Sequence, residues 1–523
     1  MNFLILLPII LPILAGVLLL VLPVKVWKNR RSMLTFSLVM LMLSAVCAFF
    51  VIASTSKANN TLTLFYLVDK IPVYFSVDRL GKIFASLVTV VMVLVEFFSV
   101  GYLGKEHGAD IEDTQENRKK EKRYHGFYLL VYGVLLGLDF AGNLVTLYLF
   151  YEIMTLVSAP LVLHTETREA IMAGLKYLIY SFCGAYMALF GIYFLYQYTD
   201  TLDFTVGGAL QTAVIAAEGK TGFMLVVVFL MILGFGVKAG MFPLHAWLPT
   251  AHPVAPAPAS AMLSGIIVKS GVLAIIRVIF YVIGPEFIRG TWVQITWIIL
   301  AMMTVLMGSA LAFKEKVFKK RLAYSTVSNL SYILLGLSML TPVGMTGAML
   351  HVVFHALIKS CLFLCAGYVI AMTGKTKVSE FAGMGKKMPW LFGCYTIAAL
   401  GLIGIPPTCG VVSKWYLAIG ALDADISVIS LVAPVVLLVS ALLTAGYLLP
   451  ISIQGFLAKE KQLSTQEKLI HMVMTEDGEI VEHTKSNMWM LVPVIILAVL
   501  IVLLGICPTS LINMISGIAA ELM

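Results

Sequence analysis

The chain has 523 residues, of which 60% are hydrophobic and only 12% are charged, and its mean hydropathy is +0.96. Soluble domains are typically about one quarter charged, so this composition excludes a soluble globular protein and indicates an integral membrane protein. The formal net charge of +8 could suggest nucleic acid or acidic lipid as a partner, but basic residues concentrated in alternate loops explain it more simply.

Apolar windows of about 20 residues predict about fourteen transmembrane helices. The first, at 3–24, lacks a basic flank and is expected to be a membrane span rather than a cleaved signal. The predicted fold class is an all-α polytopic membrane protein with a single transmembrane domain over 1–523. The remaining spans are expected at 33–54, 80–103, 126–141, 143–164, 172–197, 222–241, 258–283, 291–313, 322–341, 344–373, 390–421, 427–457 and 489–515.

Two long charged loops, 105–125 and 459–487, separate some of these spans. They belong to the set of alternate loops that holds most of the 36 lysines and arginines. By the positive-inside rule this set faces the cytoplasm, which places both termini outside the cell membrane. The 105–125 segment has no apolar periodicity, and we expect a solvated loop, with a disordered or docking segment as the alternative.

Prolines interrupt two of the predicted helices. Pro243 follows the run that contains Lys238, and Pro406 and Pro407 interrupt 390–421 just before Lys414. Proline removes a backbone donor, and non-helical backbone at membrane depth survives only inside protein or beside a water-filled path. Broken helices in corresponding halves are typical of ion transporters, and the spacing predicts two inverted five-helix repeats, 126–285 and 291–457.

Several ionisable residues lie inside apolar runs, where a charge is costly and a functional role is the default hypothesis. They include Glu152, Lys238, Lys269 and Lys414. Glu152 lies about 14 Å along its predicted helix, from nine residues at 1.5 Å each. A carboxylate there needs a cationic partner to stay charged, and Lys238 is the candidate.

One predicted helix carries His351, His355 and Lys359 at intervals of four residues, so all three share a face. Imidazole accepts and donates protons near neutral pH, which favours a proton relay. Two histidines could also bind a metal, but there is no third ligand and Lys359 would oppose a cation, so no metal is expected. The seven cysteines lie in apolar runs, and no motif indicates a nucleotide or redox cofactor.

Other polar residues have plainer explanations. Lys176 begins its predicted helix and can extend its ammonium to the inner surface, and Arg277 lies near the outer end of its span. Glu96 likewise lies within eight residues of a helix end. Asp78 and Arg79 precede the third span and are expected to cap or anchor it.

Five segments together resemble a known family. They are GFGVKAGMFPLHAWLPTAHPVAPAPASAMLSGIIVKSG, AGNLVTLYLFYEIMTLVSAPLVL, KKRLAYSTVSNLSYILLG, HVVFHALIKSCLFLCAG and GIPPTCGVVSKW. They resemble the antiporter-like membrane subunits of respiratory complex I, of Mrp-type cation/proton antiporters and of membrane-bound hydrogenases. The likeness extends from about Asp78 to Trp415. Val254 departs from it, because many members have a polar or acidic residue there.

The resemblance implies roles for individual residues. Glu152 and Lys238 would form the charge pair of an input half-channel, and Lys269 would connect it to the histidine helix with Lys359. Lys414 would lie at the output side, as in the D-type Mrp subunit and its hydrogenase and complex I relatives.

The expected function is proton translocation, with sodium as a second candidate ion, inside a complex with other membrane subunits. The chain would have no catalytic chemistry of its own, and would serve an Mrp antiporter or an oxidoreductase such as a hydrogenase or NADH dehydrogenase. A stand-alone secondary cation/proton antiporter or solute carrier is the alternative. A scaffold with relict lysines is a further, weaker one.

Overall fold

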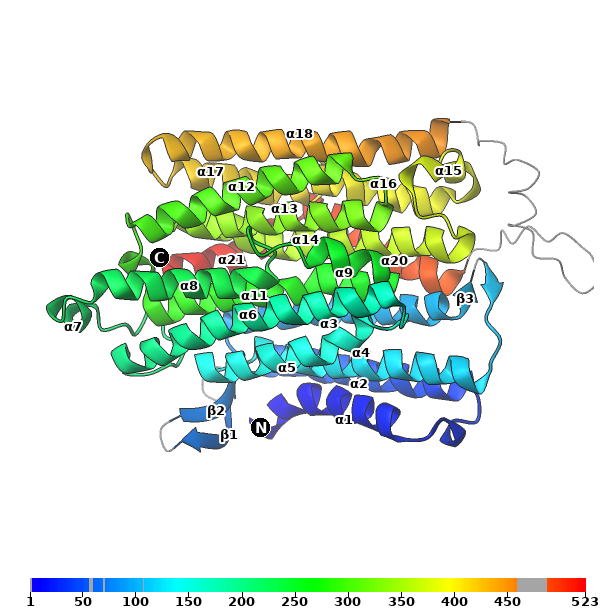
Figure 1. Cartoon of the computed structure of the whole chain (residues 1–523), viewed down its shortest axis with the longest axis horizontal. Helices are drawn as coiled ribbons and strands as arrows, with labels where there is room; N and C mark the ends of the chain where they lie inside the picture. The colour runs from blue at the N-terminus through cyan, green and yellow to red at the C-terminus, as the bar shows by residue number, and fades with distance from the viewer. Residues whose placement is uncertain (1, 56–59, 69–70, 107, 459–486) are drawn as a thin grey trace, which may run out of the picture.

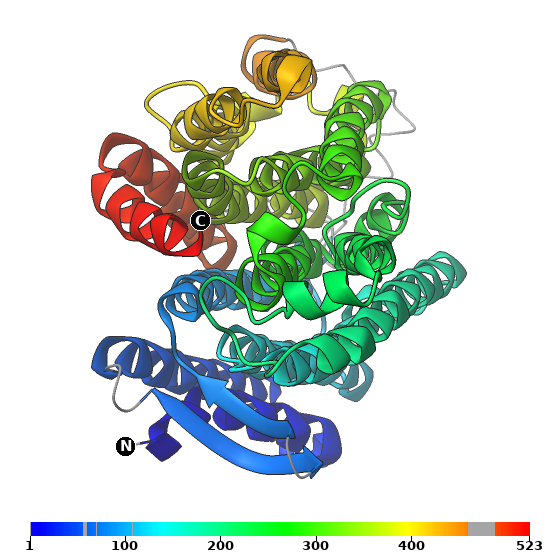
Figure 2. The ribbon, with the colours of Figure 1, turned by 90° about the vertical axis from the view of Figure 1, so that its left-hand side faces the viewer.

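The computed structural model describes residues 2–55, 60–68, 71–106, 108–458 and 487–523. The predicted charged loop 459–487 therefore lies, apart from its last residue, outside the described residues. The described chain is a bundle of helices that run along the long axis of the molecule (Figure 1). Both ends of the chain lie toward one end of this bundle, and Figure 2 shows them from that end.

Helices account for most of the fold. The first half contains α1 (Leu7–Val21), α2 (Arg30–Ser54), α3 (Arg79–Leu103), α4 (Gln115–Asp139), α5 (Leu144–Val162), α6 (Arg168–Tyr198), α7 (Thr212–Ala217), α8 (Thr221–Lys238), α9 (Leu248–Val254), α10 (Ala257–Met262) and α11 (Val268–Ile276). The second half contains α12 (Trp292–Lys314), α13 (Phe318–Ser338), α14 (Pro342–Thr373), α15 (Met384–Lys387), α16 (Pro389–Ile403), α17 (Gly410–Leu422), α18 (Ser427–Leu457), α20 (Met488–Ile506) and α21 (Thr509–Leu522).

The helix starts follow local sequence rules. Asn29, Thr114, Asn143, Thr167 and Thr341 each precede a helix and accept a hydrogen bond from a backbone N–H of its first turn. Such caps satisfy donors that have no partner within the helix. The long apolar runs between these polar residues therefore begin where the sequence supplies a cap.

Eleven of the described helices are long and apolar enough to cross a membrane. This finding confirms a polytopic all-α membrane fold, although it does not establish fourteen spans. The predicted spans 126–141 and 322–341 belong to α4 and α13, which are long but more polar. The predicted span 390–421 is divided into α16 and α17, and 489–515 into α20 and α21 at Cys507 and Pro508.

The prediction of a loop over 105–125 is wrong for its second half, where α4 already begins at Gln115. Charged side chains here are buried because the α1–α2 connection and the start of α2 supply partners. Glu121 accepts hydrogen bonds from Arg30, and Lys122 donates to the carbonyl of Leu22 at 2.7 Å. The first half forms two short paired strands, β3 (Lys105–Glu106) and β4 (Ala109–Asp110).

A β-hairpin between α2 and α3 was not predicted. Its antiparallel strands are β1 (Thr61–Val68) and β2 (Ile71–Ser76), and the hairpin lies at the end of the bundle where the chain begins (Figure 2). The segment is rich in aromatic and β-branched residues, which favour a strand. It passes unnoticed in a search for long apolar windows because each strand is short.

Two helical segments form the centre of the bundle. The run from α10 to Ile283 is buried throughout, and almost all of α14 is buried. Within this run, 263–267 and 277–283 have the wider π-helical hydrogen-bonding pattern. Gly271 allows α11 to approach α8 closely, because an added Cβ would lie 2.5 Å from the carbonyl oxygen of Phe235 and 3.1 Å from the Cβ of Lys238. The two lysine-bearing helices α8 and α11 therefore pack directly together.

Asp78 joins the start of α3 to the end of this central run. It caps α3 through the N–H of Gly81, and its two oxygens accept hydrogen bonds of 2.6 and 2.7 Å from Arg277, whose side chain is only 2% exposed. Burial opposes ionisation of Asp78, but Arg277 and the cap outweigh it and lower the pKa of the carboxyl group. The sequence predicted the cap but not the ion pair.

We predict that Asp78→Asn lowers the free energy of unfolding by about 3 kcal/mol, because asparagine keeps the cap but leaves Arg277 buried without its counter-charge. Since the pKa of Asp78 is lowered in the folded protein, this stabilisation is present above about pH 3.8 and is lost as the pH falls further. Thermal unfolding in detergent measures it. The exposed pair of Arg79 and Glu521 provides a control, and Arg79→Ala should change stability by less than about 1 kcal/mol. Equal stability of Asp78→Asn and wild type would contradict the prediction.

Candidate functional site

Lys238 is the last residue of α8, just before the break that contains Pro243. Its side chain is fully buried, and its Nζ donates a hydrogen bond to Thr155 Oγ1 on α5. The ammonium also lies 4.6 Å from the ring centroid of Tyr151 and 5.7 Å from that of Tyr177. Aromatic faces and a hydroxyl group therefore replace part of the hydration that a buried cation loses.

Glu152 lies on α5 next to Tyr151 and is partly buried. Its Oε1 is buried and has no hydrogen-bond partner among the described residues. The sequence-based expectation was a charge pair with Lys238. The two side chains are close enough to interact electrostatically, but within the described chain the lysine makes its hydrogen bond with Thr155 instead of a direct ion pair.

Lys269 lies on α11 at the centre of the bundle and is 2% exposed. Its Nζ donates to the carbonyl oxygen of Ser264 at 2.7 Å and lies 2.8 Å from Nδ1 of His355 on α14. When Lys269 is charged it can only donate, so Nδ1 accepts and the proton of a neutral His355 resides on Nε2. This contact joins the two central helices through titratable groups.

The rings of His355 and His351 continue along the same face of α14, with centroids 5.7 Å apart. His351 also stacks on Tyr332 of α13 at 5.5 Å, and its Nδ1 lies 2.9 Å from Ser413 Oγ on α17. The Nζ of Lys414 lies 5.0 Å from the ring centroid of Tyr332. A chain of adjacent polar and aromatic groups thus extends from Lys269 to Lys414.

Lys414 lies on α17 just after the break that contains Pro406 and Pro407. Its Nζ donates to the carbonyl oxygens of Leu402 and Ile403 at 2.7 and 2.8 Å. These carbonyls belong to the last turn of α16, where the helix leaves acceptors unpaired and carries partial negative charge. The break therefore supplies the partners of this lysine.

Lys359 is fully buried one turn beyond His355 on α14. It donates to Ser325 Oγ and, at 3.0 Å, to the carbonyl oxygen of Leu322 on α13. The same carbonyl accepts a hydrogen bond from Thr326, whose Oγ1 lies 2.7 Å from Ser264 Oγ. Hydroxyl groups of α13 therefore link Lys359 to the turn that holds Lys269.

A cavity of about 430 Å³ opens where α4 and α14 meet residues 253–256, at the end of α9. Lys319 lines it and donates hydrogen bonds to the carbonyl oxygens of Pro253 and Ala255. The preceding residue of α9 is the fully buried His252. Its ring stacks on Phe363 at 4.8 Å, and its two nitrogens have no partner among the described residues. His252 lies within electrostatic range of both Lys319 and Lys359.

Sequence reasoning missed the hydroxyl groups and His252. Thr155 lies one helical turn from Glu152, and Ser413 directly precedes Lys414. Tyr332 directly follows the hydroxyl-rich STVSNLS run of α13. That run contains unusually many hydroxyl groups for a buried helix. It could have been used to predict that α13 lines a polar path through the bundle. No cluster of three histidine, cysteine or acidic side chains suited to a metal ion occurs among the described residues.

Several buried polar atoms along this axis have no partner in the described chain. They are Nε2 of His351, Nε2 of His355, Ser360 Oγ, Asn329 Oδ1 and Ser331 Oγ. Buried polar atoms nearly always have partners, and ordered water often provides them. The arrangement is therefore chemically suited to hold and pass protons over a distance that no single side chain spans.

Comparisons with known proteins agree on one family. The family described as NADH:quinone oxidoreductase/Mrp antiporter, TM, matches residues 141–459. The N subunit of NADH-quinone oxidoreductase from Desulforudis audaxviator is 33% identical over 398 residues, which cover 76% of each chain. The D subunit of the Na(+)/H(+) antiporter from Bacillus subtilis is 29% identical over 463 residues, 88% of each chain.

Solved structures show the same fold. A chain of the Mrp complex from Dietzia sp. DQ12-45-1b matches with a TM-score of 0.80 at 23% identity, and the match covers 100% of this chain and 97% of that one. A chain of the membrane-bound sulfane sulfur reductase, an archaeal respiratory complex, matches with a TM-score of 0.81 at 23% identity over 100% and 98%. The family match covers residues 141–459, and the relative from Desulforudis audaxviator is 33% identical over 76% of this chain. This chain therefore belongs to the family of membrane subunits shared by NADH:quinone oxidoreductases and Mrp antiporters.

Proposed function

We propose that this chain translocates protons as one subunit of a multi-subunit complex in the cell membrane. The observation that supports the proposal most strongly is the unbroken series of contacts from Lys269 through His355, His351 and Tyr332 to Lys414. Lysine and histidine bind protons reversibly, and the neighbouring unpartnered nitrogens are acceptors or donors for water. Such a series joins the centre of the bundle to the break at Pro406.

The other end of the proposed path is the pair of Glu152 and Lys238. In an interior of low dielectric constant, a change of charge on one group is felt strongly by its neighbours. Movement of Glu152 relative to Lys238 would change the proton affinity of Lys238, and α8 packs directly on the helix that holds Lys269. The signal would then pass along the histidines to Lys414, which would release its proton beside the α16–α17 break.

The cavity beside Lys319 is the proposed entry for water toward the middle of this axis. We propose that His252 connects the cavity with Lys359, because it is buried, lies near both lysines and has two unpartnered nitrogens. The basic loops at this end of the bundle would face the cytoplasm, and both termini the outside. The two five-helix repeats, 126–285 and 291–457, would then place their breaks at Pro243 and at Pro406 and Pro407 in equivalent positions.

The proposed partners are other membrane subunits, as the names of the relatives suggest. The N and D subunits among these relatives are named as parts of NADH-quinone oxidoreductase and of the Na(+)/H(+) antiporter. We expect no catalytic chemistry from this chain itself. An electron-transfer module or a second ion gradient would supply the driving force.

Glu152→Gln is expected to reduce proton flux about a hundredfold in membrane vesicles that contain the whole complex. The amide keeps the shape of the side chain but removes the charge that acts on Lys238. Glu152→Asp should retain partial activity. Glu169→Gln, at an exposed glutamate in the first turn of α6, is the matched control and should leave the flux unchanged. Normal flux through Glu152→Gln would exclude this carboxylate from the path.

Substitutions of His355 test the contact series directly. His355→Ala should slow proton flux but leave some, because water can occupy the space of the ring, whereas His355→Phe fills the space and should stop it. Cys361→Ala, at a thiol that contacts α16 and α20, is the control for a buried substitution on the same helix. If His355→Phe transports at the wild-type rate, protons do not pass this point.

Expression of the chain alone separates a subunit from a stand-alone antiporter. In a bacterial strain that lacks its own sodium antiporters, the isolated subunit should not restore growth at high salt, because its proposed partners are absent. Co-expression with the genes of its proposed partner subunits is the positive control. Rescue by this chain alone would replace the proposal with that of a self-sufficient antiporter. Dependence of the complex's proton flux on sodium would identify the exchanged ion.

A further inference from the structure

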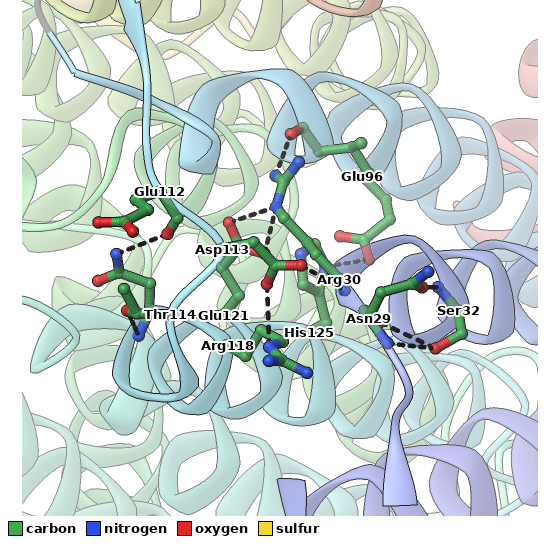
Figure 3. A network of polar contacts seen from close by, with 12 residues as sticks. Asn29, Arg30, Ser32, Glu96, Glu112, Asp113, Thr114, Arg118, Glu121 and His125 are labelled. Atoms are coloured by element: carbon green, nitrogen blue, oxygen red, sulfur yellow. Dashed lines mark hydrogen bonds and ion pairs between the residues drawn. The ribbon is translucent and has the colours of Figure 1, made fainter. Parts of the chain in front are cut away.

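A second buried pair of titratable groups lies apart from the residues proposed to carry protons, here called the lysine axis, which are Glu152, Lys238, Lys269, His355, His351, Lys359 and Lys414. Glu96 on α3 and His125 on α4 are both fully buried, and His125 Nδ1 lies 2.6 Å from Glu96 Oε1. Ser37 of α2 donates to the same oxygen at 2.9 Å. Figure 3 shows the pair within a polar network between these three helices. These hydrogen bonds join the pair to α2 and not to the lysine axis.

Half of the side-chain polar atoms of this pair have no partner in the part of the chain that the structure describes. Glu96 Oε2 and His125 Nε2 are buried and unpartnered among the described residues. A pair that served only to hold three helices together would be expected to satisfy all its polar atoms, because an unpaired buried polar atom destabilises the fold. Free positions on both members instead leave room for an additional proton or a water molecule.

Most of the charged and titratable groups that act on the pair lie on α2 and α4. Arg30 of α2 forms an ion pair of 2.7 Å with Glu121 of α4, one turn from His125 (Figure 3). Both ions lie within electrostatic range of His125. Tyr124 and Tyr128 of α4 lie within range of Glu96, and Tyr124 OH is 3.3 Å from Ser99 Oγ on α3. Arg30 and Glu121 act on the charge of His125 in opposite directions, and the Ser37 hydroxyl group contacts the pair directly.

The pair lies close to the cavity beside Lys319. Glu121 and His164 line this cavity. The ring of Tyr124 lies 5.3 Å from that of His164 and 5.4 Å from that of His125, so a single tyrosine separates the buried pair from a cavity-lining histidine. Burial, together with Arg123 and His125, lowers the pKa of His164 to about 4, so its ring is neutral at neutral pH and can accept as well as donate.

We propose that Glu96 and His125 form an additional proton-binding site, separate from the lysine axis, that exchanges protons with the cavity past Tyr124 and His164. The site holds one proton between Nδ1 and Oε1 and binds a second at Oε2 of Glu96. The proton comes from water, and no other bond is made or broken. The inference stands on the geometry of the pair and does not depend on transport through the lysine axis.

Infrared difference spectroscopy of the purified protein between about pH 5 and pH 9 tests the site, because a buried protonated carboxyl group has a resolved C=O band. We expect a band that appears with falling pH and is lost in Glu96→Gln. His125→Gln should shift its midpoint, and Ser37→Ala, which removes one hydrogen bond without touching a charge, should shift its frequency. Glu116→Gln, at an exposed carboxylate in the first turn of α4 that pairs with Lys120, is the control and should leave the band unchanged.

The outcomes are distinguishable from those of the proposed function. A wild-type spectrum without a pH-dependent buried carboxyl band, or a band that persists in Glu96→Gln, would overturn the inference and leave a fixed structural pair. The spectroscopic measurement requires no ion flux, so a failure of the transport predictions does not affect it. If Glu96→Gln does not fold, the frequency shift in Ser37→Ala decides the assignment, and an unshifted band would count against it.

Discussion

The cost of placing an ammonium group inside an apolar helical bundle is the constraint on which this structure depends. Lys238, Lys269 and Lys359 are almost completely buried, and each must replace the hydration that it loses. The described side chains do so with hydroxyl groups, carbonyl oxygens, an imidazole and aromatic faces rather than with carboxylates. These partners are neutral, whereas a carboxylate in direct contact would hold a lysine in its charged form.

The broken helices are a direct consequence of the same constraint. A continuous helix uses its carbonyl oxygens internally, but a helix that ends inside the bundle leaves its last carbonyls free. Lys414 takes two of these at the end of α16, and Lys238 lies at the end of α8. Glycine permits the close packing that these ends require. An added Cβ on Gly410 would lie only 1.8 Å from the carbonyl oxygen of Gly401.

Much of the fold and of the candidate site could be predicted before any coordinates were known. Apolar windows give the spans, because a membrane helix must satisfy its backbone internally and its length is fixed by the bilayer. The buried lysines and the histidine face follow from charges within apolar runs and from spacing along one helix. The start of α4 could not be predicted, because the charges of Glu121 and Lys122 suggest a solvated loop until Arg30 and a carbonyl oxygen from the α1–α2 connection are placed beside them.

The amino-acid sequence alone was therefore sufficient to predict a polytopic membrane protein, the positions of its breaks and the titratable residues within its apolar runs. Which of these groups meet emerged only from the packed bundle. There Lys238 contacts Thr155, Lys269 contacts His355, and Glu96 is enclosed with His125. The physical reason is that helical periodicity fixes which residues share a face, whereas the neighbour that a face meets depends on the packing of helices far apart in the chain.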